Sequence, residues 1–310
     1  ANKNNKELIK QAKFFKVKNL IVTDKKSFNS LLKKDGNKNF KIFNNFNDID
    51  KIFKKKIDYT MSSISGLEGL EPTLKMIKYS KKIAVANKEA IICGWSFIHK
   101  SLKKYKTEFI PVDSEHFSIW SLIGTNEKSM IDKVFITASG GPFLNVPSKK
   151  IKNVSLKKAL SHPNWSMGKK ISIDSATLMN KVFEVIETQR IFNLSKSKVN
   201  ILIHEKSYVH AIVEFKNGLK KILAHDTNMR IPIFNTIYDK DYKALKSKSL
   251  NIKNLNNLNF KSVDKNKFPL IKILKEIPDF NSLYETALIT INDFFVHKFY
   301  KSFYRVTKIK

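Results

Sequence analysis

The stretch 162-HPNWSMGKKISIDSATLMNKVFEVIE-187 decides how the rest of the chain is interpreted. It begins without helical periodicity, and Pro163, Asn164 and Gly168 mark it as a loop. From Asp174 onward one helical stripe is apolar, and it consists of Leu178, Met179, Val182, Phe183 and Ile186. The opposite stripe is polar, with Thr177, Asn180, Lys181, Glu184 and Glu187. The pattern predicts a loop followed by an amphipathic helix.

The start of this helix carries residues that suit an anion. We expect Asp174 or Ser175 to cap the first turn, where free backbone N–H groups favour a phosphate. A carboxylate farther along, Glu184, suits a metal or another polar group of a substrate. The simpler interpretation is a surface helix with solvated polar residues, and the helix alone favours it. The unusual loop before the helix shifts the balance toward a binding site.

Length and composition bound the class of protein. The 310 residues can form a sizeable core, and two or three domains are expected. No stretch has the apolar length of a membrane span, and the start, ANKNNKELIK, lacks the pattern of a signal peptide. The single cysteine, Cys93, excludes an internal disulfide and favours a reducing compartment. We therefore expect a cytoplasmic protein, or a plastid protein if the source is a eukaryote.

The formal net charge of +31 suggests either a nucleic-acid binder or compositional drift. Lysines are scattered along the whole chain, and arginine, the favoured residue for base and phosphate contacts, is scarce. We favour drift, because Lys, Asn, Ile and Phe are abundant everywhere. A phosphorylated ligand would still benefit from the positive field.

Strands alternate with helices in the first third of the chain. Apolar or β-branched runs predict strands at 17–23, 40–43, 59–63, 82–86 and 109–112, and helical segments separate them. Such alternation is typical of a doubly wound parallel sheet. Ligands of such sheets bind at the carboxyl ends of the strands.

Two polar clusters follow strands at that edge, ANKE at 86–89 and DSEH at 113–116. Asp113 and Glu115 can point at one place, and hard divalent ions need convergent oxygen ligands. With Glu184 as the third ligand, the set favours Mg²⁺ or Mn²⁺ over Zn²⁺. His116 is another candidate ligand, although we favour a packing or helix-start role. Lys88 and Glu89 could instead simply begin a helix.

A second α/β unit follows. A strand at 133–137 leads into the small-residue loop 138–143, which could admit an anion. Strands at 199–204, 208–215 and 219–224, with a turn at 216–218, predict a mixed sheet with an antiparallel edge. The polar stretch 239–267 is interpreted as a linker, and 268–275 and 282–304 as helices. The expected divisions are 1–112, 113–238, 239–267 and 268–310.

Five motifs occur in a characteristic order: ANKE (86–89), PVDSEH (111–116), SGGPF (139–143), the stretch 162–187, and NMRIPI (228–233). Together they resemble the 1-deoxy-D-xylulose 5-phosphate reductoisomerase family, strongly over about 1–238 and weakly beyond. The resemblance implies an α/β protein with a Rossmann-like NADP-binding domain (1–112) and a central α/β catalytic domain with a mixed sheet (113–238). A linker and a C-terminal helical domain (268–310) would follow.

The resemblance also implies a function. The family uses NADPH and Mg²⁺ or Mn²⁺ to convert 1-deoxy-D-xylulose 5-phosphate to 2-C-methyl-D-erythritol 4-phosphate in non-mevalonate isoprenoid biosynthesis. The implied metal ligands are Asp113, Glu115 and Glu184, and Glu115 and Glu184 would also contact the substrate. The implied phosphate-binding residues are Ser139, Ser175, Asn180 and Lys181, and further substrate contacts are Lys88, Ser114 and His162. Lys88, Asp113, Glu115, His162 and Glu184 would form the catalytic set.

Other implied positions concern the cofactor, a lid and assembly. Asn87, Glu89 and Gly168 match positions near the nicotinamide, and Lys3 and Asn4 match the ribose-phosphate end. Trp165 and Met167 match a mobile lid that closes over the substrate. The family forms homodimers, and neither a membrane nor a nucleic acid is an expected partner.

The chain departs from the family pattern in several places. The family's first strand, Gly-rich turn and first helix are expected to be missing, and its closing helical bundle cut short at Lys310. Val182 replaces a glycine and is expected to crowd the helix. HPQS reads His204-Glu205-Lys206-Ser207, and the family's Ala-Ala-Asn-Glu is matched to Thr286-Ala287-Leu288, without Asn-Glu. Two alternatives to an active enzyme remain: an impaired, truncated relative that binds only metal or phosphate, and a basic nucleic-acid-binding protein.

Overall fold

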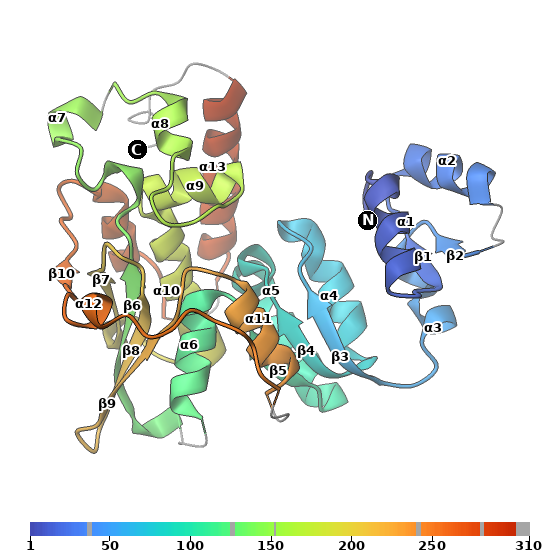
Figure 1. Cartoon of the computed structure of the whole chain (residues 1–310), viewed down its shortest axis with the longest axis horizontal. Coiled ribbons are helices and arrows are strands. Elements are labelled where there is room, and N and C mark those ends of the chain that lie inside the picture. Colours follow the sequence, from blue (N-terminus) through green and yellow to red (C-terminus); the bar gives the residue numbers. More distant parts are fainter. Residues whose placement is uncertain (36–38, 125–127, 152, 240–242, 280–281, 302–310) are drawn as a thin grey trace.

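The computed structural model describes residues 1–310 except 36–38, 125–127, 152, 240–242, 280–281 and 302–310. Helices and strands alternate as predicted in the first third of the chain. The strands form three sheets of two, three and five strands. Figure 1 shows the two-stranded sheet at one end of the molecule and the five-stranded sheet at the other.

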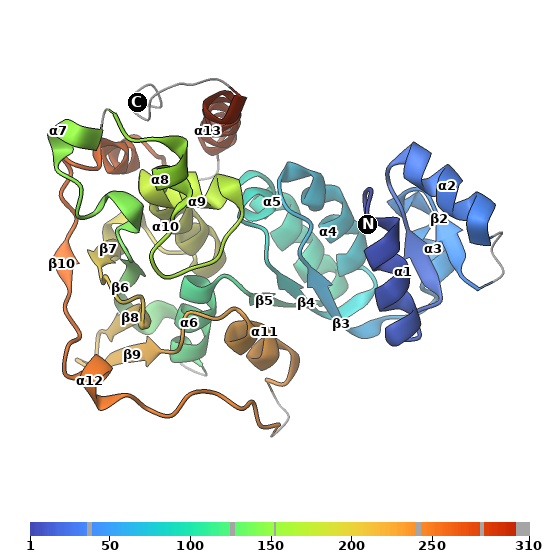
Figure 2. The same ribbon diagram turned by 45° about the horizontal axis from the view of Figure 1, so that its top comes forward.

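The N-terminal unit, residues 1–53, is a small α/β layer. Strands β1 (Asn19–Ile21) and β2 (Lys41–Phe43) pair in parallel. Helices α1 (Asn5–Phe14), α2 (Lys25–Asp35) and α3 (Ile49–Ile52) accompany them. Its core is a separate cluster of six buried side chains: Ala12, Leu20, Val22, Leu31, Phe40 and Ile42. Figures 1 and 2 show the unit set apart from the helices at the centre of the molecule.

The second sheet is parallel and joins β3 (Ile57–Ser62), β4 (Ser80–Val85) and β5 (Glu108–Pro111). Helices α4 (Leu70–Ile77) and α5 (Lys88–Tyr105) connect these strands. The expected single doubly wound sheet is divided, because no pairing joins β1 to β3 among the described residues. Ala1 instead lies beside β1, where its ammonium donates to the Ile21 carbonyl at 2.7 Å.

The five-stranded sheet has the order β10-β7-β6-β8-β9. Its strands are β6 (Ile131–Ala138), β7 (Val199–Ile203), β8 (Val209–Phe215), β9 (Lys220–Ala224) and β10 (Lys261–Ser262). Only β6 and β7 pair in parallel, so the predicted mixed sheet with an antiparallel edge is confirmed. The interpretation of 239–267 as a plain linker is incomplete, because this stretch holds β10 and the short α12 (Ile252–Leu255).

Helix α10 (Met179–Phe192) lies at the centre of the larger part of the molecule. One core cluster joins it to α4, α5, α6 (Ser114–Ile123) and the sheets. A second cluster joins it to α9 (Lys169–Ala176) and α13 (Tyr284–Lys301). Every residue of α10 except Asn180 is buried. The surface-helix interpretation is therefore wrong. Val182, where the family has a glycine, is fully buried, and α10 continues through it without a break.

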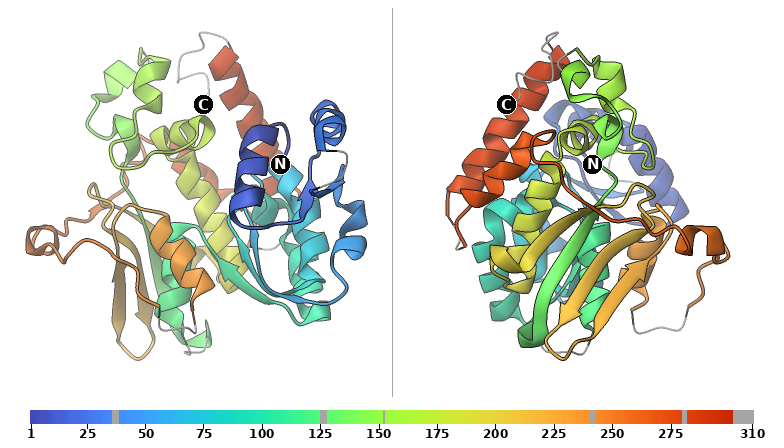
Figure 3. Two further views of the ribbon diagram at one scale, coloured as in Figure 1. Left: turned by 45° about the vertical axis from the view of Figure 1, so that its right-hand side comes forward. Right: turned by 90° about the vertical axis from the view of Figure 1, so that its left-hand side faces the viewer.

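The remaining helices cover the edges of this body. Two short helices, α7 (Ser148–Ile151) and α8 (Leu156–Leu160), precede the stretch 162–187, and α11 (Arg230–Ile237) packs on the parallel sheet through Ile233. The expected helix at 268–275 is a 3₁₀ helix, Pro269–Lys275. Figure 3 places α13 and the segment around α12 on opposite sides of the five-stranded sheet. No helix among the described residues is both long and apolar enough to cross a membrane.

Candidate active site

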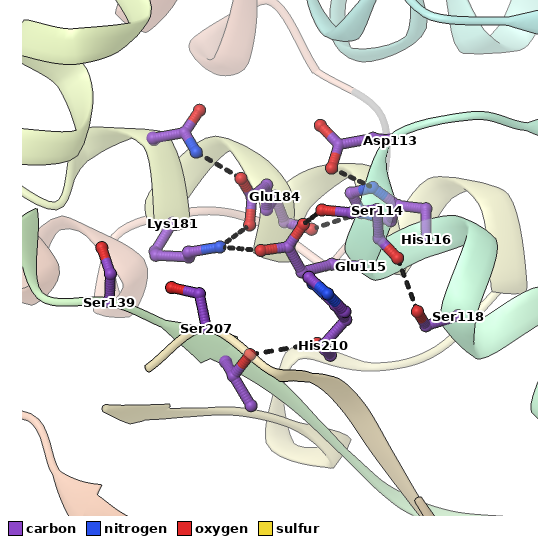
Figure 4. Close-up of polar contacts among 12 residues, drawn as sticks. Asp113, Ser114, Glu115, His116, Ser118, Ser139, Lys181, Glu184, Ser207 and His210 are labelled. Atoms are coloured by element: carbon purple, nitrogen blue, oxygen red, sulfur yellow. Dashed lines mark hydrogen bonds and ion pairs between the residues drawn. The ribbon is translucent and has the colours of Figure 1, made fainter. Parts of the chain in front are cut away.

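The structure brings three predicted carboxylates together. Oxygen atoms of Asp113, Glu115 and Glu184 all lie within 4.8 Å of one another. Asp113 directly precedes α6, Glu115 lies in the first turn of α6, and Glu184 projects from α10 (Figure 4). The strand-to-helix turn after β5 therefore faces the central helix with two acidic side chains, as the sequence predicted.

Two lysines lie among these carboxylates. The Lys181 ammonium donates to Glu184 Oε2 at 2.5 Å and also to Glu115. The Lys88 ammonium, from the first turn of α5, lies 3.4 Å from Asp113 Oδ2 and 3.5 Å from Glu184 Oε1. Asn180 accepts a hydrogen bond from Lys88 and donates one to Glu184. The predicted Lys88, Ser114, Asn180 and Lys181 thus converge with the carboxylates, and Ser114 Oγ donates to Glu115 at 2.5 Å.

The balance of charge suits a cation. Burial raises the pKa of Glu184 to about 8, and the neighbouring Glu115 charge adds to this effect. Burial also acts to raise the pKa of Glu115, but the Lys181 ammonium outweighs it and lowers the value to about 2. With a pKa of about 8, Glu184 is largely protonated near pH 7 in the absence of a cation. A cation bound among these oxygens would favour its ionised form, and three carboxylates would then outnumber the two ammonium groups. An all-oxygen donor set of this kind fits Mg²⁺ or Mn²⁺.

A second acidic residue of α10 lies beside this site. Asp113, His116 and Glu187 also offer ligand atoms within 4.8 Å of one another. His116 is fully buried, and its Nε2 donates to the Glu184 carbonyl at 3.0 Å, so it ties α6 to α10. This contact agrees with the packing role that we favoured for His116. Burial raises the pKa of Glu187 to about 8.

The predicted start of the central helix is wrong. Asp174 and Ser175 lie in the last turn of α9 and do not cap α10. The chain breaks at Leu178, whose φ of 60° is left-handed, and α10 begins at Met179. Asp174 is buried and accepts from Lys170 and Asn292, which explains why it does not serve as a cap. Ser175 nevertheless remains close to the small-residue loop.

That loop follows β6 and contains Ser139, Gly140 and Gly141. Gly141 has a φ of 64°, and a Cβ there would lie 2.6 Å from the Ser175 carbonyl oxygen. Any larger residue would push the loop away from α9. The glycine thus lets Ser139 and Ser175, two predicted phosphate contacts, approach each other.

His162 joins the loop 162–168 to Ser139. Its Nδ1 accepts from the backbone N–H groups of Asn164 at 3.2 Å and Trp165 at 2.9 Å. The ring proton therefore lies on Nε2, which donates to Ser139 Oγ at 3.0 Å. Burial, with a smaller contribution from the Lys181 charge, lowers the pKa of His162 to about 4. The ring is neutral near pH 7 and holds both the loop and Ser139.

The predicted cofactor-binding residues are not brought to the carboxylates. Asn87 caps α5 by accepting from Ala90 N, and Glu89 accepts from Lys170 at 3.0 Å. Gly168 is the exposed residue before α9, and no atom lies within 4 Å of the position of a Cβ there. Lys3 and Asn4 are exposed in the N-terminal unit, and Asn4 caps α1. Their cofactor roles remain predictions.

Sequence reasoning missed two residues at this site. His210, from β8, is buried, and its ring lies below Glu115 in Figure 4. It packs edge-on against Trp165 and stacks on His225, with ring centroids 3.8 Å apart. Ser207 accepts from the Asn164 side chain at 2.9 Å, which ties the loop 162–168 to the segment just before β8. The alternation of β8 gave no signal for the burial of His210, because His210 lies on the same face of the strand as the partly buried Ile212 and Glu214.

The C-terminal helix carries an Asn-acid pair of its own. The family's Ala-Ala-Asn-Glu is matched to Thr286-Ala287-Leu288, without Asn-Glu, and an Asn-Asp pair, Asn292-Asp293, lies farther along α13. Asn292 donates to Asp174 at 2.9 Å, and Asp293 lies 3.1 Å from Lys170. Both residues of this pair thus contact α9.

A separate pocket of about 600 Å³ lies between α11 and the segment 243–254. Tyr208, His225 and Phe234 are among its lining residues, and none of the three carboxylates is. We therefore assign the chemistry to the carboxylate site, where charged groups converge.

Family profiles match most of the chain. The profile "1-deoxy-D-xylulose 5-phosphate reductoisomerase" matches residues 1–94, and its C-terminal domain profile matches 109–192. The "DXP reductoisomerase C-terminal domain" profile matches 225–310.

Curated relatives and solved structures point to the same family as the profiles. The reductoisomerase of Pelagibacter ubique is 60% identical over 300 residues, which cover 96% of this chain and 77% of that protein. The Wolbachia pipientis wMel enzyme is 36% identical over 301 residues, which cover 95% of this chain and 76% of that enzyme. The structure of the Zymomonas mobilis enzyme in complex with NADPH has a TM-score of 0.90 and 28% identity, and covers 100% of this chain and 80% of that one. The structure of a reductoisomerase in complex with NADPH, fosmidomycin and magnesium has a TM-score of 0.90 and 29% identity. The match covers 100% of this chain and 79% of that one. The chain belongs to the 1-deoxy-D-xylulose 5-phosphate reductoisomerase family.

Proposed function

We propose that the chain catalyses the NADPH- and divalent-metal-dependent conversion of 1-deoxy-D-xylulose 5-phosphate to 2-C-methyl-D-erythritol 4-phosphate. The convergence of Asp113, Glu115 and Glu184 within 4.8 Å carries this proposal. Solved relatives are described in complex with NADPH and with magnesium, which supports both cofactors. When bound, the metal would polarise the substrate's carbonyl and hydroxyl oxygens, and NADPH would supply the hydride.

The residues around the carboxylates orient the substrate. Lys88 lies between Asp113 and Glu184, so its ammonium can donate to a substrate oxygen next to the metal position. Burial acts to lower the pKa of Lys88, but the surrounding carboxylates outweigh this and raise it, so Lys88 stays protonated. Ser114, which donates to Glu115, can turn its hydroxyl toward a substrate hydroxyl. These groups position atoms and stabilise charge.

The phosphate group would bind on the side of Lys181 that faces Ser139 (Figure 4). We assign Ser139, Ser175, Asn180 and Lys181 to this group. The His162 ring, with its proton on Nε2, keeps Ser139 at the site and adds a further N–H donor beside it. Trp165, held by His162 and packed on His210, would exclude water above the substrate.

Assembly and location are further parts of the proposal. We propose a homodimer, as in the family, and a cytoplasmic location. The half-buried thiol of Cys93, the one cysteine of the chain, fits a reducing compartment.

Glu184→Gln tests the metal site. The glutamine keeps the shape and the hydrogen bond from Asn180 but removes one anionic ligand. We expect kcat to fall at least about a hundredfold, with the magnesium half-saturation concentration raised. Steady-state NADPH oxidation measures both quantities, and Glu214→Gln on β8 is the matched control. Wild-type turnover in Glu184→Gln would remove Glu184 from the metal set, whereas a wild-type chain without turnover would favour the impaired relative.

Lys181→Ala tests the phosphate site. We expect KM for the phosphorylated substrate to rise about tenfold or more, because a charge-assisted contact to the phosphate is lost. The comparison uses a non-phosphorylated analogue, for which the change should be small, and Lys169→Ala as the exposed control. An equal effect on both substrates would show that Lys181 acts on the carboxylates alone.

A further inference from the structure

Lys170 lies outside the residues discussed as substrate contacts, yet it joins three helices. Its ammonium lies 3.0 Å from Glu89 Oε1 on α5, 3.0 Å from Asp174 Oδ2 on α9 and 3.1 Å from Asp293 Oδ1 on α13. Asn292 of α13 completes the cluster by donating to the other oxygen of Asp174 at 2.9 Å. One cation therefore satisfies carboxylates from three separate parts of the sequence.

The position of Lys170 in the chain connects this cluster to the loop 162–168. Lys170 is the second residue of α9 and follows the loop 162–168 directly. The other end of the loop is held at His162 and at Asn164, which donates to Ser207 and to the Glu205 carbonyl. Gly168 between them meets no neighbour, so Lys170 is the first anchor after the loop.

The surroundings of Lys170 make its charge necessary. Asp174 is 1% exposed and Glu89 is 8% exposed. Removing the ammonium would leave these buried carboxylates without their cation, and an uncompensated buried charge is costly. The first turn of α9 would then separate from α5 and α13, and the loop before it would lose its fixed end.

We propose that Lys170 is a positioning residue for the reaction: it anchors the loop 162–168 and α9 against α5 and α13. The proposal rests on the proposed function for its effect on catalysis. Lys170 acts through His162 and Trp165 in the loop before α9 and through Ser175 in the last turn of α9. Loss of this anchor should therefore affect binding of the phosphorylated substrate more than binding of the metal, whose ligands lie at the start of α6 and on α10.

The test compares Lys170→Met with Lys170→Arg, and Lys169→Met is the matched control. Lys169 is the exposed neighbour in the same turn, so its loss changes the net charge equally. We expect Lys170→Met to raise KM for the phosphorylated substrate about tenfold or more, with the magnesium half-saturation concentration within about twofold of wild type. Lys170→Arg should restore KM to within about threefold, because arginine keeps the charge.

Hydrogen–deuterium exchange of the full chain without substrate supplies a readout that does not depend on turnover. Faster exchange in 162–168 and the first turn of α9, with the α10 amides unchanged, is the expected result for Lys170→Met. Asp293→Asn should give a smaller increase, and the double variant should match Lys170→Met alone, because the two residues form one contact. Unchanged exchange in 162–168, or equal effects of Lys169→Met and Lys170→Met, would overturn the proposal. Faster exchange in a chain that shows no turnover would support the anchor while contradicting the proposed function.

Discussion

The N-terminal unit and the region around α10 differ in the size of the apolar cores that stabilise them. The N-terminal unit encloses six buried apolar side chains, and Phe14 and Phe15 next to them are 78% and 68% exposed. Helix α10 is buried on every face and separates two large core clusters. The paired charges of Lys181 and Glu184 are buried on α10, where the large apolar clusters exclude water. A buried ion pair of this kind therefore needs a deep apolar surround.

The first prediction concerns the deeper region. Phe183 is 1% exposed and belongs to the second core cluster, which also contains residues of α9 and α13. Phe183→Ala should lower the free energy of unfolding by about 3 to 5 kcal/mol, since a large cavity opens. Urea denaturation followed by circular dichroism measures the change. A loss below about 1 kcal/mol would mean that this core can collapse onto the cavity.

The second prediction concerns the N-terminal unit. Leu31 is 2% exposed within the separate six-residue cluster. Leu31→Ala should cost about 2 to 3 kcal/mol, and the effect should stay local because this cluster shares no residue with the others. Hydrogen exchange should therefore accelerate in residues 5–43 and remain unchanged in α10. Acceleration in α10 as well would show that the two regions unfold as one unit.

The third prediction uses acid to separate the regions. Burial lowers the pKa of His210 to about 3, below its ordinary value of 6.5, so the native state holds the ring neutral. The unfolded chain binds this proton more readily as pH falls from 6.5 toward 3, so stability is lost in that window. The loss should reach about 2 kcal/mol by pH 5.

Urea denaturation at pH 7 and pH 5 measures this loss, and His210→Gln should reduce it. No histidine occurs in the first 98 residues, so exchange in the N-terminal unit should not show this histidine-dependent change. An identical acid loss in wild type and His210→Gln would assign the effect to other groups.

Much of the site could be predicted from local sequence. Asp113 and Glu115 follow a recognisable strand, and the apolar stripe of α10 pointed to a helix that presents Glu184 on its other side. The break at Leu178 could not be predicted, because a leucine rarely adopts a left-handed φ and tertiary packing imposes it. The burial of the polar stripe was missed for a related reason: residues of α5 and α6, more than 60 positions earlier in the chain, cover it. Lys88 lies against Glu184, Glu115 against Lys181, and His116 against Glu187.

Long-range pairs were beyond local patterns. Lys170 resembles its exposed neighbour Lys169 in sequence, and only the fold brings Glu89 and Asp293 to it. The division of the expected sheet into β1–β2 and β3–β4–β5 likewise depends on which strand edges meet in space.

The left-handed residue between α9 and α10 has a consequence for electrostatics. An uninterrupted helix through Ser175 and Lys181 would use every peptide N–H in its own ladder. Restarting at Met179 creates a new positive pole at the start of α10. Its first amides are partly satisfied locally, because Met179 N–H donates to Thr177 Oγ1 and Lys181 N–H donates to the Leu178 carbonyl. The left-handed backbone at Leu178 thus gives the site around Lys181 a second source of attraction for anions, supplied by main-chain dipoles and independent of any side chain's protonation.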